Sequence, residues 1–304
     1  MNTFKTTISV LRELSLTDIR EDAERIPHVL VFGPTQFDAR WLADGLFGER
    51  ESDTIVTREL TGAITDIERY DAVVVFDPHG DAEALGLNAG LRALRTAPPI
   101  FRIGGVDPVD DTRLDELRME MVRRLDNRAI AFARVFPKLR ASASKNEIDQ
   151  AAIANAQFAL VTNIPSLIPV IGGFASAGAD MIVLTKNQAI MVYKLAAIHG
   201  RDLHNQIEIF QEITPIIGAG FVWRSAARAA TTMLPFAAGT IPKVGIAYAA
   251  TMSMGRAAEF YYRTEMRPTK EQLSGYLRQG IDTVKQLPIA KLARRNRPGN
   301  ELDG

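Results

Sequence analysis

Three short segments of the N-terminal half place glycine and polar residues directly after apolar runs. They are Gly33-Pro-Thr-Gln-Phe-Asp38, Asp77-Pro-His-Gly80 and Gly104-Gly-Val-Asp107. The apolar runs before them are typical of buried strands, and helical patterns separate the strands. Because ligands of parallel α/β sheets bind at the carboxyl ends of the strands, these three loops are the first candidates for a binding site.

The first loop can be compared with the phosphate loop of Ras-like GTPases. That loop has the pattern G-x-x-x-x-G-K-[ST], in which glycines let the backbone approach the phosphates and lysine contacts them. After Gly33 the second glycine, the lysine and the hydroxyl residue are missing, and Asp38 brings a negative charge. Arg40 lies one position too late to replace the lysine. The pattern is not that of a standard phosphate loop.

The other two loops keep only fragments of nucleotide motifs. Asp77 and Gly80 form D-x-x-G, but they follow the strand after the expected one, and Asp107 is all that remains of N-K-x-D. The loops therefore have two interpretations. Either Gly33, Arg40, Asp77, Gly80 and Asp107 bind GTP weakly, or they are ordinary turn residues of a fold without a nucleotide. We favour the second interpretation and expect no cofactor and no catalytic residue.

The elements around these loops predict a small, mainly parallel α/β sheet, comparable to a degenerate P-loop GTPase domain. We expect strands at 28–33, 54–60, 70–77 and 99–104, and helices at 38–47, 82–95 and 111–125. The domain boundary is expected at residues 140–145, where a run of small polar residues follows a basic stretch.

An uncharged, apolar segment dominates the C-terminal half. From Phe158 to Ala179 no residue carries a formal charge, and this length is enough to cross a hydrocarbon core. Its prolines and glycines favour two helices, 151–162 and 175–199, joined near 164–173. The segment is either a buried helical hairpin or a membrane-inserted one. Gly200 is expected to end the second helix, and later helices are predicted at 244–262 and 268–286, with Thr269 and Gln272 capping the last.

Composition limits the class of protein. Hydrophobic residues make up 46% and charged residues 24%, which argues against a dense polytopic membrane protein. Residues 1–140 contain 19 basic and 24 acidic residues, and residues 141–304 contain 17 and 12. The absence of cysteine excludes disulfides and thiolate metal sites. We expect no metal site, no nucleic-acid binding and no secretory signal.

Four polar residues lie in the second helix predicted for the apolar segment. Asp180 either caps the second helix or, in a membrane, pairs with Lys186. Lys186, Asn187 and Gln188 form either a solvated helix face or a specific contact.

Basic residues near the end of the chain suggest membrane contacts. Trp223, Arg224 and Arg228 suit either a membrane-interface anchor or an ordinary surface stripe. The tail, 285–297, has five basic residues and no acid, so it is either a solvated tail or a contact to anionic lipid.

Several motifs of the C-terminal half together resemble one known domain. They are Ala179–Gly200, Glu212-Ile-Thr-Pro, Trp223-Arg-Ser-Ala-Ala-Arg228, Ile241-Pro-Lys243, Gly255-Arg-Ala-Ala and Arg267-Pro-Thr. The string resembles the YcjF-like domain of unknown role, over about Ser142–Gln286. That domain accompanies small Ras-like GTPases in bacteria and is regarded as membrane-associated. The resemblance therefore implies membrane association and adds Lys243 to the candidate residues.

These observations predict a bacterial protein of three parts. We expect a degenerate GTPase-like α/β domain over 1–140, an all-α, membrane-associated helical domain over 141–286, and a basic flexible tail over 287–304. The expected function is a non-catalytic scaffold or regulator on the cytoplasmic face of a membrane, with lipid and a protein partner or a second copy as partners. The alternatives are a weak GTP-binding switch and a soluble helical interaction module.

Overall fold

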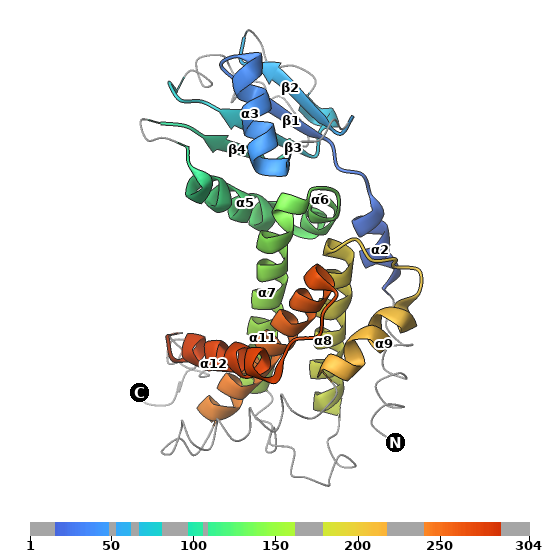
Figure 1. Cartoon of the computed structure of the whole chain (residues 1–304). Helices are drawn as coiled ribbons and strands as arrows, with labels where there is room; N and C mark the ends of the chain where they lie inside the picture. The colour runs from blue at the N-terminus through green and yellow to red at the C-terminus, as the bar shows by residue number, and fades with distance from the viewer. Residues whose placement is uncertain are drawn as a thin grey trace, which may run out of the picture. The chain divides into compact units, whose positions relative to one another are not determined.

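The computed structural model describes residues 16–48, 53–61, 67–80, 97–105, 109–161, 179–217 and 240–286 (Figure 1). Its elements in chain order are α2 (Thr17–Glu24), β1 (Val29–Gly33), α3 (Gln36–Phe47), β2 (Ile55–Glu59), η1 (Ile67–Arg69), β3 (Ala72–Phe76), β4 (Ile100–Ile103), α5 (Asp111–Leu125), η2 (Asp126–Arg128), α6 (Ala129–Val135), η3 (Pro137–Leu139), α7 (Arg140–Val161), α8 (Ala179–Ile198), α9 (Gln206–Ile217), α11 (Thr240–Thr264) and α12 (Lys270–Gln286).

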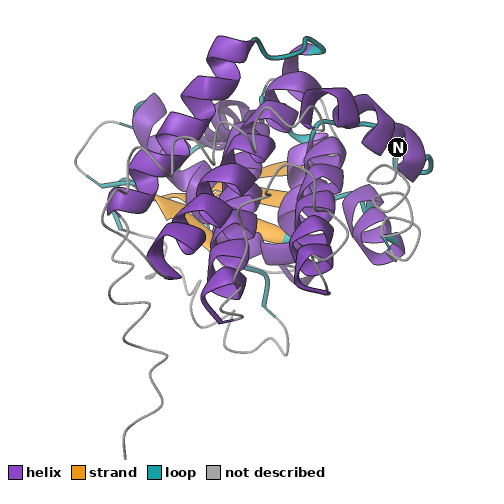
Figure 2. Ribbon diagram, turned by 90° about the horizontal axis from the view of Figure 1, so that it is seen from below, coloured by secondary structure: helices purple, strands orange, loops and turns teal. Residues whose placement is uncertain are grey.

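The chain divides into two compact units. The first, called the α/β unit below, consists of Thr17–Asn146 together with Ala197–Asp202. The second, called the helical unit, takes its described residues from Glu147–Ala196 and from Leu203 onward, together with Leu16. Strands occur only in the first unit among the described residues, as Figure 2 shows in orange against the purple helices.

The α/β unit contains a four-stranded, entirely parallel sheet in the order β2-β1-β3-β4. Strand β1 therefore lies between β2 and β3, and the strand order reverses at β1. In open parallel α/β sheets ligands bind at such a reversal point, which lies here between β1 and β3. The predicted α/β class with a small parallel sheet is confirmed.

Side-chain alternation gives each face of the sheet its own core. A Cβ at Gly33 would meet α3, so the odd-numbered residues of β1 face that helix. The opposite face is lined by a buried cluster comprising Leu30, Phe32, Leu60, Ile67, Tyr70, Val73 and Val75. Strands β1 and β3 are almost wholly buried, as their continuous apolar sequences predicted.

The predicted elements of the α/β unit agree with the described ones to within two residues at each end. The helix predicted at 82–95 lies outside the described residues. The region 140–145, where the domain boundary was predicted, is helical and forms the first turns of α7. Ser142 and Ser144 are buried there, so the small polar run allows close packing and does not form a linker.

The helical unit is built on the packing of α11 against α12. Ile246, Ala249 and Leu277 form a buried cluster between these helices. Gly280 allows the close approach, because a Cβ there would lie 2.9 Å from the Ala249 Cα. The described part of helix α8 begins at Ala179, within the predicted range 175–199, and Met191, Val192, Leu195 and Ile198 along it are buried. The proline-rich joint lies outside the described residues.

Candidate functional site

The N-terminus of α3 is the place where a phosphate would bind if the first loop were a nucleotide site. Side chains of the same unit already accept from the N–H groups of Thr35, Gln36 and Asp38 there. The Thr35 N–H and hydroxyl both donate to Asp38 Oδ2, at 3.2 and 2.7 Å, and the Asp38 N–H donates to Thr35 Oγ1 at 3.1 Å. The Gln36 N–H donates to Glu59 Oε1 at 3.3 Å. Two carboxylates thus lie at this helix end, and either would repel a phosphate.

Close backbone packing accounts for two glycines of the strand-end loops. A Cβ at Gly33 would lie 2.5 Å from the Ala39 N, so the glycine lets α3 begin directly against β1. At Gly104 a Cβ would lie 2.0 Å from the Asp77 O. Only a residue without a side chain therefore lets the ends of β3 and β4 approach so closely. Both glycines therefore have a packing reason that is independent of any ligand.

The remaining predicted nucleotide residues do not form one site in the described structure. Arg40 lies in α3 and forms a mostly exposed ion pair with Asp44, 3.5 Å away. Asp77 follows β3, and its N–H donates to the Ile103 carbonyl at 2.8 Å. Gly80 has a φ of 80° and nothing near its Cβ position, so it is a turn glycine. Asp107 lies outside the described residues.

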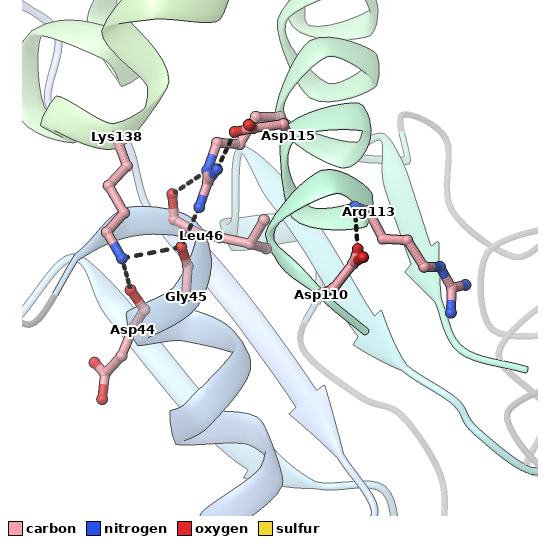
Figure 3. A network of polar contacts seen from close by, with 8 residues as sticks. Asp44, Gly45, Leu46, Asp110, Arg113, Asp115 and Lys138 are labelled. Atoms are coloured by element: carbon pink, nitrogen blue, oxygen red, sulfur yellow. Dashed lines mark hydrogen bonds and ion pairs between the residues drawn. The ribbon is translucent and has the colours of Figure 1, made fainter. Parts of the chain in front are cut away.

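The opposite end of α3 shows a polar network that sequence reasoning missed (Figure 3). Arg118, buried in α5, donates to the carbonyls of Gly45 and Leu46 and also pairs with Asp115. Lys138 Nζ donates to the carbonyls of Asp44 and Gly45, at 3.1 and 3.3 Å. Two cations therefore cap the carbonyl groups that end the helix, where the helix dipole favours positive charge. The network fixes α3 and has no group free to act as an acid or a base.

A second polar network lies inside the helical unit and joins three helices. The Asn155 Nδ2 of α7 donates to the Thr251 Oγ1 of α11 at 2.9 Å. From α8, Asn187 Nδ2 donates to Asn155 Oδ1 at 2.9 Å, and Gln188 Nε2 donates to Thr251 Oγ1 at 3.3 Å. Asn155 and Thr251 are fully buried and Gln188 is nearly so. We call these four residues the amide network.

The chemistry of the amide network is structural. Its members are amides and a hydroxyl, which carry no charge near neutral pH and cannot act as general acids or bases. Each hydrogen bond joins two different helices, so any slip of one helix would leave a buried polar group without a partner. The network therefore specifies how α7, α8 and α11 pack together.

Some of the candidate residues predicted for the helical domain belong to the amide network, and others do not. Asn187 and Gln188 belong to it through partners on α7 and α11; Gln188 is buried, and Asn187 is half-buried. Lys186 is half-buried beside them. Asp180 lies in the first turn of α8, and Lys243 lies in α11. Trp223, Arg224 and Arg228 lie outside the described residues.

Asn155 and Thr251 were missed by the sequence analysis. Asn155 follows an Ala-Ala-Ile-Ala run, and Thr251 has alanines before it and a methionine after it, so both have mostly small or apolar neighbours. These neighbours are a weak signal that could have drawn attention to the two residues, since a buried polar side chain needs a partner.

Comparison with protein-family models, with curated proteins and with solved structures finds no match for this chain. Among the described helices, none combines the length and the apolar character that crossing a bilayer requires. The described residues also bring together no group of three His, Cys, Asp or Glu side chains suited to a metal.

Proposed function

We propose that this chain is a non-catalytic scaffold or regulatory protein whose α/β unit binds no nucleotide. The supporting observation is the N-terminus of α3, where Asp38 and Glu59 accept the N–H groups that a phosphate would need. A nucleotide would have to displace both carboxylates and expose them beside its own charge. The P-loop-like character predicted for this unit is then limited to its α/β architecture.

Titration of the full-length chain with GTP and magnesium tests this part of the proposal. We expect no binding by calorimetry up to millimolar nucleotide and no phosphate release. Micromolar affinity that Asp77→Ala removes would contradict the proposal.

That contrary result would favour a weak GTP-binding switch, the second candidate function. One observation supports this candidate. Gly33 ends β1 and Asp77 follows the neighbouring β3, at the point where the strand order reverses, which is the usual ligand position in such sheets. Asp107→Ala would separate the two candidates further, because base recognition by that residue predicts a loss of GTP affinity.

An exposed apolar face on α3 supports a role in binding other proteins. The side chains of Phe37 and Trp41 are one turn apart, and the two residues are 78% and 40% exposed. Trp41 also contacts the ring of Phe76, with 5.7 Å between the ring centroids. Exposed aromatic side chains grouped in this way are typical of protein-contact surfaces. Sedimentation velocity of the full chain tests for a homo-oligomer, which Phe37→Ser with Trp41→Ser should dissociate.

We also propose that the helical domain associates with the cytoplasmic face of a membrane. The supporting features are the uncharged segment 158–179 and the basic tail 285–297, together with the resemblance to a membrane-associated domain. Cell fractionation tests the proposal. Retention of the chain through an alkaline carbonate wash would indicate insertion, and release by high salt would indicate binding through the tail. A chain found only in the soluble fraction would contradict it.

A further inference from the structure

The arginines of the two units differ in how their N–H groups are used. In the α/β unit, half-buried or buried arginines donate to backbone carbonyls: Arg113 to Gly104, Arg118 to Gly45 and Leu46, and Arg134 to Ala197 and Arg201. In the helical unit, Arg256 and Arg263 of α11 form no hydrogen bond to any other described residue. Their N–H groups therefore remain available to an acceptor from outside the described structure.

The two arginines lie on one face of α11, on either side of a single acid. Arg256 Nη1 is 3.9 Å from Glu259 Oε2, and Arg263 Nε is 4.0 Å from Glu259 Oε1. These distances bring the charges close but are too long for hydrogen bonds. The two guanidinium groups share the Glu259 carboxylate without a hydrogen bond to it. Their donors are therefore suited to an anion.

Burial makes the unused donors of Arg256 unusual. Only 28% of its side chain is exposed, and its Nε is buried without a hydrogen-bond partner in the described structure. A buried donor without an acceptor is unfavourable, and a guanidinium is most stable when its planar fork meets an oxyanion. An anion that accepted from the outer N–H groups of Arg256 would offset this cost.

A third donor comes from α12. Tyr276 is half-buried, and its pKa is raised by burial and by the nearby Glu259 carboxylate, so its hydroxyl stays protonated at neutral pH. Helix α12 is held against α11 at Gly280 and through Leu277, which fixes the position of Tyr276 relative to the two arginines. The donors therefore come from two helices whose packing is already determined.

We propose that Arg256, Arg263 and Tyr276 bind a phosphate group at the junction of α11 and α12. Two guanidinium groups and a hydroxyl supply several donors, which suits the several oxygens of a phosphate better than the two of a carboxylate. The phosphate is carried either by a phospholipid head group or by a soluble phosphorylated molecule. The inference depends only on the helical unit and stands whether or not the α/β unit binds nucleotide.

Binding assays on the full-length chain test the site with two probes. One probe is pyrophosphate, titrated by calorimetry, and the other is a phosphatidylcholine vesicle with and without phosphatidylglycerol, measured by co-sedimentation. Arg256→Gln with Arg263→Gln removes the site. Lys270→Gln with Arg278→Gln is the matched control, because both residues are exposed on α12 and the loss of charge is the same. Glu259→Gln removes the acid that competes with the ligand.

We expect the arginine double variant to lose at least about tenfold in affinity for whichever probe binds, since each charge-assisted hydrogen bond contributes strongly. The control should stay within about twofold, and Glu259→Gln should bind more tightly. Binding of vesicles alone identifies a lipid head group, and binding of pyrophosphate identifies a soluble phosphate. Equal losses in the double variant and the control would overturn the proposal, as would no binding of either probe. Thermal unfolding of each variant checks that the helical unit is intact.

Discussion

The two units satisfy their buried polar groups with different chemistry. In the α/β unit, charged side chains bind backbone carbonyls, as Arg118 and Lys138 do at the end of α3. In the helical unit, neutral side chains bind one another across helices, as Asn155 and Thr251 do. A helix end needs a donor that complements its dipole, whereas a helix interior has no free backbone groups, so its buried polar side chains must pair with one another. The helical unit also holds a charged pair of this kind, between Lys194 and the buried Glu147, 3.0 Å apart. The units should therefore respond differently to the same kind of substitution.

The largest expected effect is at the backbone of the α/β unit. Gly104→Ala places a Cβ where the Asp77 carbonyl oxygen lies 2.0 Å away, and backbone cannot move aside cheaply. We expect a loss of about 3 kcal/mol in the free energy of unfolding. Gly275→Ala is the control in the helical unit, because nothing lies within 4 Å of its Cβ position, and it should stabilise α12 by about 0.5–1 kcal/mol. Urea unfolding followed by circular dichroism measures both.

The second comparison concerns the charged cap of α3. Arg118→Met leaves the Gly45 and Leu46 carbonyls without this donor, and we expect a loss of about 2–3 kcal/mol. The fluorescence of Trp41, in a Trp223→Phe background, follows unfolding of α3 itself. Arg40→Met on the same helix is the control, since its ion pair is exposed and should contribute less than about 0.5 kcal/mol. Equal losses in the two variants would show that general charge, and not the cap, stabilises α3.

These differences also explain which features could be predicted from the sequence alone and which could not. Strands β1 and β3 were predictable because both are buried on two faces and their sequences are continuously apolar. The cap of α12 was confirmed, since the Thr269 N–H donates to Gln272 Oε1 at 2.8 Å and the Gln272 N–H to Thr269 Oγ1 at 3.2 Å. Gly200 lies in the turn two residues after the end of α8, with a φ of 82°, and its N–H donates to the Ala197 carbonyl at 3.0 Å.

The parts that were missed depend on contacts between residues distant in sequence. Arg118 lies in a charged amphipathic helix and cannot be distinguished by sequence from its exposed neighbours. Asn155 and Thr251 are 96 positions apart, and no local pattern pairs them. Local patterns predict helices, strands and caps, but partners across the fold require the tertiary structure. The resemblance to the YcjF-like domain remains a prediction for the same region.

The third comparison tests the amide network by removing one partner and then two. Asn155→Leu keeps most of the volume but leaves the Asn187 amide without its acceptor and the Thr251 hydroxyl with Gln188 alone, and should cost about 2 kcal/mol. Adding Asn187→Leu should recover part of this loss, because an apolar pair needs no hydrogen bond. Hydrogen exchange of the α8 amides measures the effect within the helical unit. Ser253→Ala is the control, since the Ser253 hydroxyl donates only within α11, to the Ala249 carbonyl. A double variant less stable than the sum of its parts would contradict a paired network.

The smallest expected effect is confined to alkaline pH and to the helical unit. The pKa of Tyr248 is raised by burial and by the Asp149 carboxylate, partly opposed by Arg256. The folded chain therefore holds this proton more tightly than the unfolded chain, so the contribution of Tyr248 is fully present below the unfolded pKa of about 10 and is lost as pH rises through the folded value. Tyr248→Phe should make the unfolding free energy of the helical unit fall less steeply above that pH, while leaving the α/β unit, followed by Trp41 fluorescence, unchanged. Tyr248 is buried in the helical unit, so its ionisation should affect that unit alone. If Tyr248→Phe changed the alkaline stability of both units equally, the loss of stability would instead arise from general charge repulsion.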